Sequence, residues 1–429
     1  MWSPADSYGP WIGLCIVAFL VAALVVRSRA PRVPIWSIMA FTSFISVLSG
    51  LVGFDELETV IDLDVILFLI GMFSIIGLAD SSGLLEAISL WFIGKFKRRL
   101  TLVYGSSLLF GLLSAVAVND TVALMGPPIA LTIARAAGLD PKMMFLLLAF
   151  SLTVGSVMTP MGNPQNILIA ARSGLDAPFL VFASKLALPT LINLLLVPWV
   201  LIKLYGVRDA RVELGLIPSE AIKNRRDAAL AAVGLISAVC FLVANDVLEL
   251  RGLPHVERRG IIPFVVASAI YMFSSSPRQL LARVDWGTIV FFIAMFITME
   301  GVWRSGALAP VLGALMSSKE TGPEGVLRLA VASLALSQAL SNVPFVRLFI
   351  AHMRSLGYGG GDAEAWLALA AFSTIAGNLT ILGAASNVIV LECLESRMRT
   401  TIDFVEFAKR GSIVTAINAL VYSAFFAML

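Results

Sequence analysis

Two polar clusters interrupt long apolar runs of the chain, and they are where chemistry could occur. The first reads Val-Asn-Asp-Thr at residues 118–121, and the second reads Gly-Asn-Pro-Gln-Asn at residues 162–166. Asp120 is an ionisable group within a stretch apolar enough to lie in a membrane, where such groups are costly and usually functional. We therefore expect the clusters to bind a ligand, with the remaining chain positioning them.

The composition indicates the class of protein that must hold these clusters. The 429 residues are 59% hydrophobic and only 14% charged, whereas soluble domains carry roughly 25% charged residues. Several apolar runs approach the ~20 residues that a helix needs to cross a ~30 Å hydrocarbon core. They are too long for barrel strands, and backbone groups in lipid must be satisfied locally. The sequence therefore predicts an all-α polytopic membrane protein.

Charge and cysteine usage exclude several other functions. The net charge of +3 gives no support for nucleic-acid binding. Cys15, Cys240 and Cys393 are scattered in apolar segments, without the paired spacing of a metal site or a disulfide framework. Because no catalytic constellation is visible, we expect neither an enzyme nor a bound cofactor or metal.

The apolar pattern predicts ten spans and two re-entrant hairpins. Two prolines and a glycine, Pro160, Gly162 and Pro164, should break the fourth span near its middle. The ninth span, which contains Gly377 and Gly383, is expected to be broken at the corresponding position. The spans are expected at residues 11–27, 34–53, 64–79, 143–171, 177–205, 228–245, 260–275, 286–303, 365–393 and 411–428, with hairpins at 100–134 and 327–353.

Basic residues predict the orientation of these spans. Arg27, Arg29 and Arg32 lie between the first two spans, and short basic loops stay on the cytoplasmic face. The N-terminus is therefore expected outside, in a multi-pass protein of the inner (plasma) membrane. The basic segments 95–99 and 206–226 follow as cytoplasmic loops, and the sequence leaves open whether a cytoplasmic ATPase subunit docks on them.

An internal repeat relates the two halves of the chain. Residues 61–73 align with residues 284–296, and the same offset of 223 pairs Asn119 with Asn342. An offset of 221 pairs Gly162 with Gly383 and Asn166 with Asn387. Because five spans separate equivalent points, the halves should be inverted relative to each other. The predicted organisation is a first repeat at 1–205, a cytoplasmic linker at 206–226 and a second repeat at 227–429.

The repeat predicts a binding frame that both halves supply. Helices that stop at the midplane leave N–H groups unpaired at one end and carbonyls at the other, and asparagine or serine offers donors and acceptors beside them. Four polar clusters take part, at residues 119–121, 162–166, 341–342 and 377–387. Ordinary polar contacts between helices explain one such cluster, but explain four matched clusters poorly. The candidate binding residues are Asn119, Thr121, Gly162, Asn163, Asn166, Ser341, Asn342, Asn378, Ser386 and Asn387.

Asp120 is the asymmetric member of this frame, because Val343 occupies the equivalent position. We expect Asp120 to couple transport to protons or sodium; the alternative is an aspartate that caps the second helix of the hairpin. Arg347 could hold an anion or pair with a carboxylate, and His352 is expected at the surface.

The motifs VNDTVALMGPP, TPMGNPQN, LSNVP and AGNLTILGAASN resemble those of the ion transporter superfamily. That superfamily includes arsenite permeases, D-type sodium/proton antiporters and divalent-anion/sodium symporters. The resemblance implies inverted five-span halves, each with a hairpin and a broken helix, and an elevator motion. It extends over nearly the whole chain.

Within the superfamily, the hairpin tips point to a substrate class. Dicarboxylate symporters of the superfamily typically have Ser-Asn-Thr at both hairpin tips. This chain has Asn-Asp-Thr at 119–121 and Ser-Asn-Val at 341–343. The first tip is more similar to arsenite permeases, which implies proton-coupled efflux of arsenite or antimonite as a small neutral solute. A sodium- or proton-coupled transporter of a small anion, such as a dicarboxylate or sulfate, is the alternative. A non-transporting membrane scaffold is a third reading, and the sequence does not decide whether the protein forms a homo-oligomer.

Overall fold

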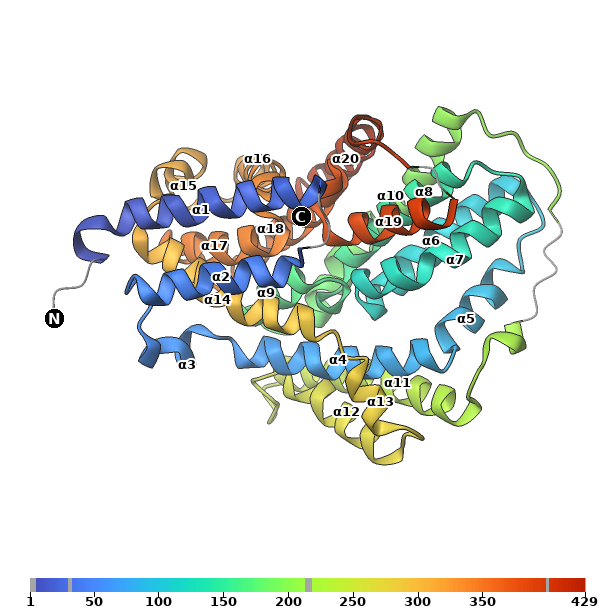
Figure 1. Cartoon of the computed structure of the whole chain (residues 1–429), viewed down its shortest axis with the longest axis horizontal. Helices are drawn as coiled ribbons and strands as arrows, with labels where there is room; N and C mark the ends of the chain where they lie inside the picture. The colour runs from blue at the N-terminus through green and yellow to red at the C-terminus, as the bar shows by residue number, and fades with distance from the viewer. Residues whose placement is uncertain (1–4, 30–32, 213–217, 399–400, 429) are drawn as a thin grey trace.

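The computed structural model describes residues 5–29, 33–212, 218–398 and 401–428 (Figure 1). Within these ranges the regular secondary structure is helical, apart from an isolated antiparallel bridge between Arg98 and Arg211. The prediction of an all-helical fold is confirmed. Arg32 and linker residues 213–217 lie outside the described residues, so the orientation of the N-terminus and the linker boundaries remain predictions.

The first half runs from α1 to α10. Its helices are α1 Ala5–Arg29, α2 Ile35–Leu48, η1 Phe54–Glu56, α3 Leu57–Val60, α4 Leu63–Ser81, α5 Leu84–Ile93, α6 Arg99–Ala117, α7 Asn119–Ala137, α8 Pro141–Gly155, η2 Ser156–Met158, η3 Pro160–Gly162, α9 Pro164–Arg172 and α10 Pro178–Tyr205.

The second half follows a short turn, η4 Pro218–Ala221, in the linker. Its helices are α11 Arg225–Leu250, α12 Ile261–Phe273, α13 Pro277–Ala282, α14 Trp286–Ser305, α15 Ala309–Leu315, α16 Gly322–Leu340, α17 Asn342–Ser355, α18 Ala363–Ile375, η5 Ala376–Asn378, η6 Ile381–Gly383, α19 Ala385–Met398 and α20 Phe404–Phe426.

The order of elements is the same in both halves. Each has long helices, then a hairpin with a one-residue tip, then a helix broken by two 3₁₀ turns, then a final long helix. Asp62 and Asp285, paired by the offset of 223, both cap the helix that follows them. These correspondences support the internal repeat, and the relative inversion of its halves remains a prediction.

Within the described ranges, six helices are long and apolar enough to cross a membrane, judged by length and composition. The helices α2 and α12 are shorter than the spans expected at 34–53 and 260–275, with 14 and 13 residues. At 1.5 Å per residue each extends only about 20 Å. The chain leaves α2 through Gly50, which has a left-handed φ of 74° and so favours a helix end.

The halves pack through equivalent pairs of helices. We call the group of helices α1, α2, α4, α11, α12 and α14 the frame. Within the frame, α2 lies against α14, and α12 lies against α4 (Figure 1). Around the hairpins, α7 contacts α19, and α17 contacts α9. Each hairpin therefore rests on the broken helix of the other half. Where α6 crosses α8, a Cβ added to Gly155 would lie 2.2 Å from the Cα of Gly111, so this close approach requires glycine.

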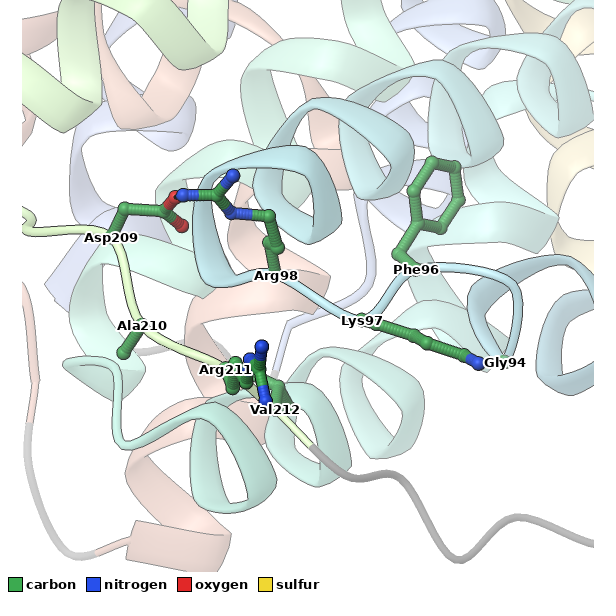
Figure 2. Close-up of a pocket in the computed structure, with 8 residues that line it drawn as sticks. All are labelled: Gly94, Phe96, Lys97, Arg98, Asp209, Ala210, Arg211 and Val212. Atoms are coloured by element: carbon green, nitrogen blue, oxygen red, sulfur yellow. Dashed lines mark ion pairs between the residues drawn. The ribbon is translucent and has the colours of Figure 1, made fainter.

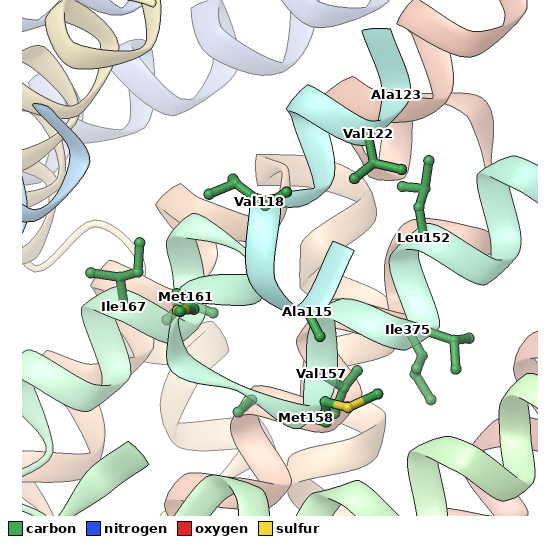
Figure 3. Close-up of a cluster of buried hydrophobic side chains, with 14 of the residues drawn as sticks. Ala115, Val118, Val122, Ala123, Leu152, Val157, Met158, Met161, Ile167 and Ile375 are labelled. Atoms are coloured by element: carbon green, nitrogen blue, oxygen red, sulfur yellow. The ribbon is translucent and has the colours of Figure 1, made fainter. Parts of the chain in front are cut away.

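The tip of the first hairpin is seated on a buried apolar cluster. Val118 and Val122 lie with Val157, Met161 and Ile167 from the neighbouring broken helix (Figure 3). Val118 and Val122 are fully buried. This packing holds the polar residues that follow Val118 at a fixed place.

Candidate functional site

Both hairpin tips have an unusual backbone. Val118 has φ 61° and ψ 132°, and Ser341, at the offset of 223, has φ 69° and ψ 159°. Among the described residues the only other non-glycine residue with positive φ is Ala177. Such conformations cost about 1–3 kcal/mol and concentrate at functional sites. This backbone conformation lets each hairpin reverse its direction within one residue. The helices α7 and α17 therefore begin directly at the hairpin tips.

Both breaks consist of two short 3₁₀ turns, η2 and η3 in the first half and η5 and η6 in the second. After α8 the chain makes two 3₁₀ turns, with Thr159 and Asn163 extended between and after them. Pro160 and Pro164 lack the N–H that a continuous helix would need. A Cβ on Gly162 would lie 2.2 Å from the carbonyl oxygen of Ser156, so the tight return of the chain requires glycine there.

Asn166 and Asn387 pair the carbonyls that the breaks expose. The Asn166 Nδ2 donates to the carbonyl oxygens of Ser156 at 3.1 Å and Thr159 at 3.1 Å. The Asn387 Nδ2 donates in the same way to those of Gly377 at 2.7 Å and Thr380 at 3.3 Å. Each asparagine therefore fixes its own break.

Asn163 and Asn378 link neighbouring elements. Asn163 caps α9, because its Oδ1 accepts from the N–H of Asn166 at 2.8 Å. Its Nδ2 donates to the hydroxyl of Thr374 on α18 at 3.2 Å. The Asn378 Nδ2 donates to the carbonyl oxygen of Phe150 on α8 at 3.4 Å. These bonds tie the broken helix of one half to that of the other.

A cavity of about 240 Å³ lies where both hairpin tips and both breaks meet the frame. Its walls come from α2, α14, the starts of α7 and α17, and the starts of α9 and α19. The lining residues are Ile35, Trp36, Asn119, Asp120, Pro164, Gln165, Asp285, Gly287, Thr288, Phe291, Phe292, Ser341, Asn342, Val343, Ala384 and Ala385.

The cavity brings together part of the candidate set that the sequence suggested. Asn119, Asp120, Ser341 and Asn342 line it. The other candidates surround it without lining it: Thr121, Gly162, Asn163, Asn166, Asn378, Ser386 and Asn387. Hydrogen bonds from Asn163, Asn166, Asn378 and Asn387 hold the breaks in place. The Oδ1 atoms of Asn166, Asn378 and Asn387 have no hydrogen-bond partner among the described residues, so a binding role for these residues remains a prediction.

Sequence reasoning missed the contribution of the frame. Asp285 caps α14, with its Oδ1 accepting the N–H of Thr288 at 3.0 Å and its Oδ2 accepting the Thr288 hydroxyl at 2.6 Å. The repeat marked this aspartate by pairing it with Asp62, but an N-cap is an ordinary role. Gln165 was also missed, although it stands within the 162–166 motif. Its Nε2 donates to the Thr374 hydroxyl at 3.3 Å.

The charges around the cavity are acidic. Asp120 and Asp285 both line it, and no lysine or arginine does so among the described residues. Like charges that share one cavity repel each other, which favours binding of a proton or a cation between them. An anion entering alone would meet that repulsion as well.

The cavity also offers neutral hydrogen-bonding groups. The helices α7 and α17 begin here without a side-chain cap, so N–H groups of their first turns are free to donate. The Oδ1 atoms of Asn119 and Asn342 are buried, with no hydrogen-bond partner in the described part of the chain. A small solute carrying several hydroxyl groups could both donate and accept here.

An ion-pair network lies at the opposite end of α14 from the cavity. On α14, Glu300 binds Arg347 of α17 at 2.9 Å and Arg304 at 2.8 Å. Arg304 continues to Glu56 at 2.6 Å. Thr288 in the cavity and Glu300 are separated by roughly 18 Å along the helix. Arg347 is 8% exposed, so of the two roles left open for it, the structure shows the pairing with a carboxylate.

The network is anchored in the frame by its outermost carboxylate. Glu56 accepts the N–H of Gly53 at 3.0 Å and pairs with Arg304. Both interactions hold the pKa of Glu56 below its ordinary value, so this end of the network stays charged at mildly acidic pH.

A second ion pair lies close to the network. Arg172 at the end of α9 pairs with Asp62, the cap of α4, and both are near enough for their charges to act on Arg347. The equivalents of Arg172, Glu300 and Arg347 in the other half are Cys393, Gly77 and Leu124. Leu124 is 64% exposed, which contrasts with buried Arg347. Among the described residues, these ion pairs therefore join the second hairpin and α9 to the frame at one end of α14 and have no counterpart at the equivalent positions of the other half.

The expectation that His352 lies at the surface is wrong. The side chain is buried, and its Nε2 lies 2.8 Å from the carbonyl oxygen of Met316. Phe349 and Trp303 pack beside the ring, so the packing of α17 against its neighbours overrides the polarity of this residue.

Comparisons with known proteins agree with a transport site. A family model described as a citrate transporter (CitMHS) matches residues 9–376. An uncharacterized transporter of Mycobacterium tuberculosis, Rv2685, is 28% identical over 89% of this chain and 90% of its own. The silicon efflux transporter LSI3 of rice (Oryza sativa subsp. japonica) is 25% identical over 83% of this chain and 84% of its own. The crystal structure of the YdaH transporter from Alcanivorax borkumensis has the same fold, with a TM-score of 0.56 at 15% identity, covering 87% of each chain.

Proposed function

The chain belongs to the CitMHS citrate transporter family, and on that premise we propose that this secondary transporter exports a small neutral hydroxylated solute in exchange for protons. Arsenite or antimonite, uncharged trihydroxy acids at neutral pH, are the proposed substrates. The observation that carries this proposal is the cavity itself, which has two aspartates and no basic side chain among its described lining residues.

The proposed binding mode follows from the groups that face the cavity. Solute hydroxyls would donate to the free Oδ1 atoms of Asn119 and Asn342, while solute oxygens accept from the uncapped first turns of α7 and α17. A neutral solute avoids the repulsion that Asp120 and Asp285 would exert on an anion. The name of the rice relative, a silicon efflux transporter, supports export of a hydroxylated metalloid.

Asp120 is the proposed coupling residue. It lies on a hairpin, whereas Asp285 lies on the frame, so relative motion of the two bodies would change the distance between their charges. A proton bound at Asp120 would relieve the repulsion when the two aspartates face each other. Binding of a proton and of the solute would thereby be linked to the position of the hairpins.

The ion pairs support an elevator motion of the hairpins and broken helices against the frame. Arg347 and Arg172 belong to the proposed moving body, and their partners Glu300 and Asp62 belong to the frame. Opening of the site toward the network end requires these pairs to separate. In the topology that the basic residues predict, the network end faces outside and the cavity faces the cytoplasm.

A cation-coupled transporter of a small anion is the second candidate. The family description names citrate, and the uncapped helix starts at the cavity favour negative charge. In this alternative, sodium or protons at Asp120 and Asp285 would cancel the acidic charge before the anion binds.

Substrate accumulation in everted membrane vesicles distinguishes the two candidates. The proposal predicts that an imposed pH gradient, acid inside, drives arsenite into vesicles that contain the protein, and that citrate and sodium leave this accumulation unchanged. Accumulation of citrate driven by a sodium or proton gradient directed into the vesicles, without arsenite accumulation under the acid-inside gradient, would favour the second candidate. Empty vesicles and vesicles with an unrelated transporter are the controls.

A further inference from the structure

A second, larger cavity of about 750 Å³ lies outside the proposed transport site. It is bounded by the segment that precedes α6 and by the segment that follows α10, and Lys97, Arg98 and Arg211 are among its lining residues (Figure 2). Both α6 and α10 are long and apolar enough to cross a membrane. Because α6 starts at Arg99 and α10 ends at Tyr205, the cavity lies at the boundary between membrane and water.

The backbone holds the two walls of this cavity together. The N–H of Arg99 donates to the carbonyl oxygen of Ala210 at 2.9 Å, and the N–H of Val212 donates to that of Lys97 at 3.0 Å. These bonds form the bridge between Arg98 and Arg211. The basic side chains are therefore presented by an ordered backbone.

The only carboxylate that lines the cavity among the described residues is already neutralised. Asp209 accepts from the guanidinium of Arg98 at 2.5 Å and from the N–H of Leu100 at 3.2 Å. Figure 2 shows Arg98 reaching toward Asp209, while Lys97 extends separately toward Gly94. Lys97 and Arg211 have no carboxylate partner within the described residues. Counting only the part of the chain that the structure describes, the cavity therefore carries two positive charges without a counter-charge.

An apolar surface adjoins this positive charge. On α5, one turn before the cavity, Trp91 is 57% exposed and Ile88 is 40% exposed. The Nζ of Lys95 lies 3.3 Å from the centre of the Trp91 ring. Tryptophan and lysine arranged in this way are typical of the interface between headgroups and acyl chains. A soluble anion would use the charges alone, whereas a lipid would use both surfaces.

We infer that this cavity binds the headgroup of an anionic phospholipid. Its phosphodiester contacts Lys97 and Arg211, and its acyl chains follow the exposed face of α5 beside Trp91. Basic pockets at the cytoplasmic ends of membrane helices suit such headgroups. The bound lipid also braces the linker against the start of the first hairpin, because the bridge between Arg98 and Arg211 joins these two segments.

Native mass spectrometry of the full-length protein in detergent tests this inference without a transport assay. Phosphatidylglycerol and phosphatidylcholine are titrated separately into the wild type and the double variant Lys97→Gln/Arg211→Gln. We expect the wild type to bind phosphatidylglycerol preferentially. The double variant should lose about thirtyfold in apparent affinity, given roughly 1 kcal/mol for each basic residue near an anionic lipid. Lys97→Gln alone, with half of the charge removed, should show an intermediate loss.

The matched control is Lys223→Gln/Arg225→Gln, which removes the same charge from exposed positions near the start of α11. It should leave lipid binding at the wild-type level. An equal loss in this control would show a diffuse charge effect and overturn the site. Equal binding of the two lipids would also overturn it. Displacement of phosphatidylglycerol by equimolar inorganic phosphate would identify a soluble-anion site instead.

Discussion

At the scale of single residues, the hairpin tips combine strain with buried polar atoms. Val118 and Ser341 adopt backbone conformations that glycine would adopt without strain, yet the chain has valine and serine there. The buried side chain of Val118 offsets part of that cost by packing on the apolar cluster beneath it. The tip is therefore held by its surroundings rather than by its own preference.

Replacement of Val118 tests whether this strain is real. Val118→Ala keeps the strain and loses buried methyl groups, which should cost about 2 kcal/mol in the free energy of unfolding. Val118→Gly loses slightly more surface but relieves about 1–3 kcal/mol. We expect the glycine variant to be at least as stable as the alanine variant in thermal unfolding measurements.

Val122 provides the matched control for this comparison, because it is equally buried and lies within α7. There glycine should be about 1 kcal/mol less stable than alanine, as in any helix interior. The same order of stabilities at both positions would argue against strain at Val118.

The sequence predicted the site residues unevenly. Asn119, Asp120, Ser341 and Asn342 stood out because polar residues are costly inside apolar runs, and all four line the cavity. Asp285 did not stand out, because it caps a helix at the edge of an apolar run, as many aspartates do. Its role depends on the tertiary contact between α14 and the hairpins, which no local pattern reveals.

At the scale of elements, the breaks in the two interrupted spans depend on their asparagines. A broken helix leaves carbonyl groups without intrahelical partners, and Asn166 and Asn387 supply donors to them. Pro160, Gly162 and Pro164 predicted the first break, and the repeat with Gly383 predicted the second. They did not predict that these asparagines serve the backbone, since an amide can equally face a ligand.

Asn166 variants test this structural role. Asn166→Ala removes one donor from each of the carbonyls of Ser156 and Thr159. Ser156 keeps a bond from the Asn163 amide at 3.3 Å, and Thr159 keeps one from the N–H of Gly162 at 3.3 Å, so the loss should cost about 1 kcal/mol. Asn166→Asp should cost more, because it brings an acceptor toward those carbonyl oxygens. Thermal unfolding in detergent measures both effects. An aspartate variant as stable as the wild type would show that the asparagine does not hold the break.

At the scale of the whole molecule, an ion-pair network lies at one end of α14 and the cavity lies at the other. The network of Glu56, Arg304, Glu300 and Arg347 joins a hairpin to the frame at its end. The long spans and the repeat could be predicted from the sequence, because periodicity and matched motifs are local signals. The one-sided network could not, because its members lie far apart in the chain.

Arg347→Gln should shift the molecule toward opening at the network end. The variant loses a charged hydrogen bond worth about 1.5–3 kcal/mol in the closed arrangement. The readout is labelling of Ser341→Cys by an impermeant thiol reagent from the predicted outer face, in a background without Cys15, Cys240 and Cys393. The labelling rate should rise in the Arg347→Gln variant.

The control for this prediction is Arg328→Gln on the same hairpin. Arg328 pairs with Glu320 and Glu324 at an exposed position on α16, where an ion pair contributes little. Its removal should leave labelling unchanged. Equal labelling rates in wild type and Arg347→Gln would show that the network does not hold this end closed.

Transport by Asp120→Asn in everted vesicles shows whether the cavity between the two halves couples solute export to protons through Asp120. Arsenite accumulation is measured with and without an imposed pH gradient, and Asp80→Asn, a carboxylate at the exposed end of α4, is the control. The account predicts that Asp120→Asn lets arsenite equilibrate but abolishes accumulation driven by the gradient, while Asp80→Asn behaves as the wild type. Undiminished gradient-driven accumulation by Asp120→Asn would contradict it.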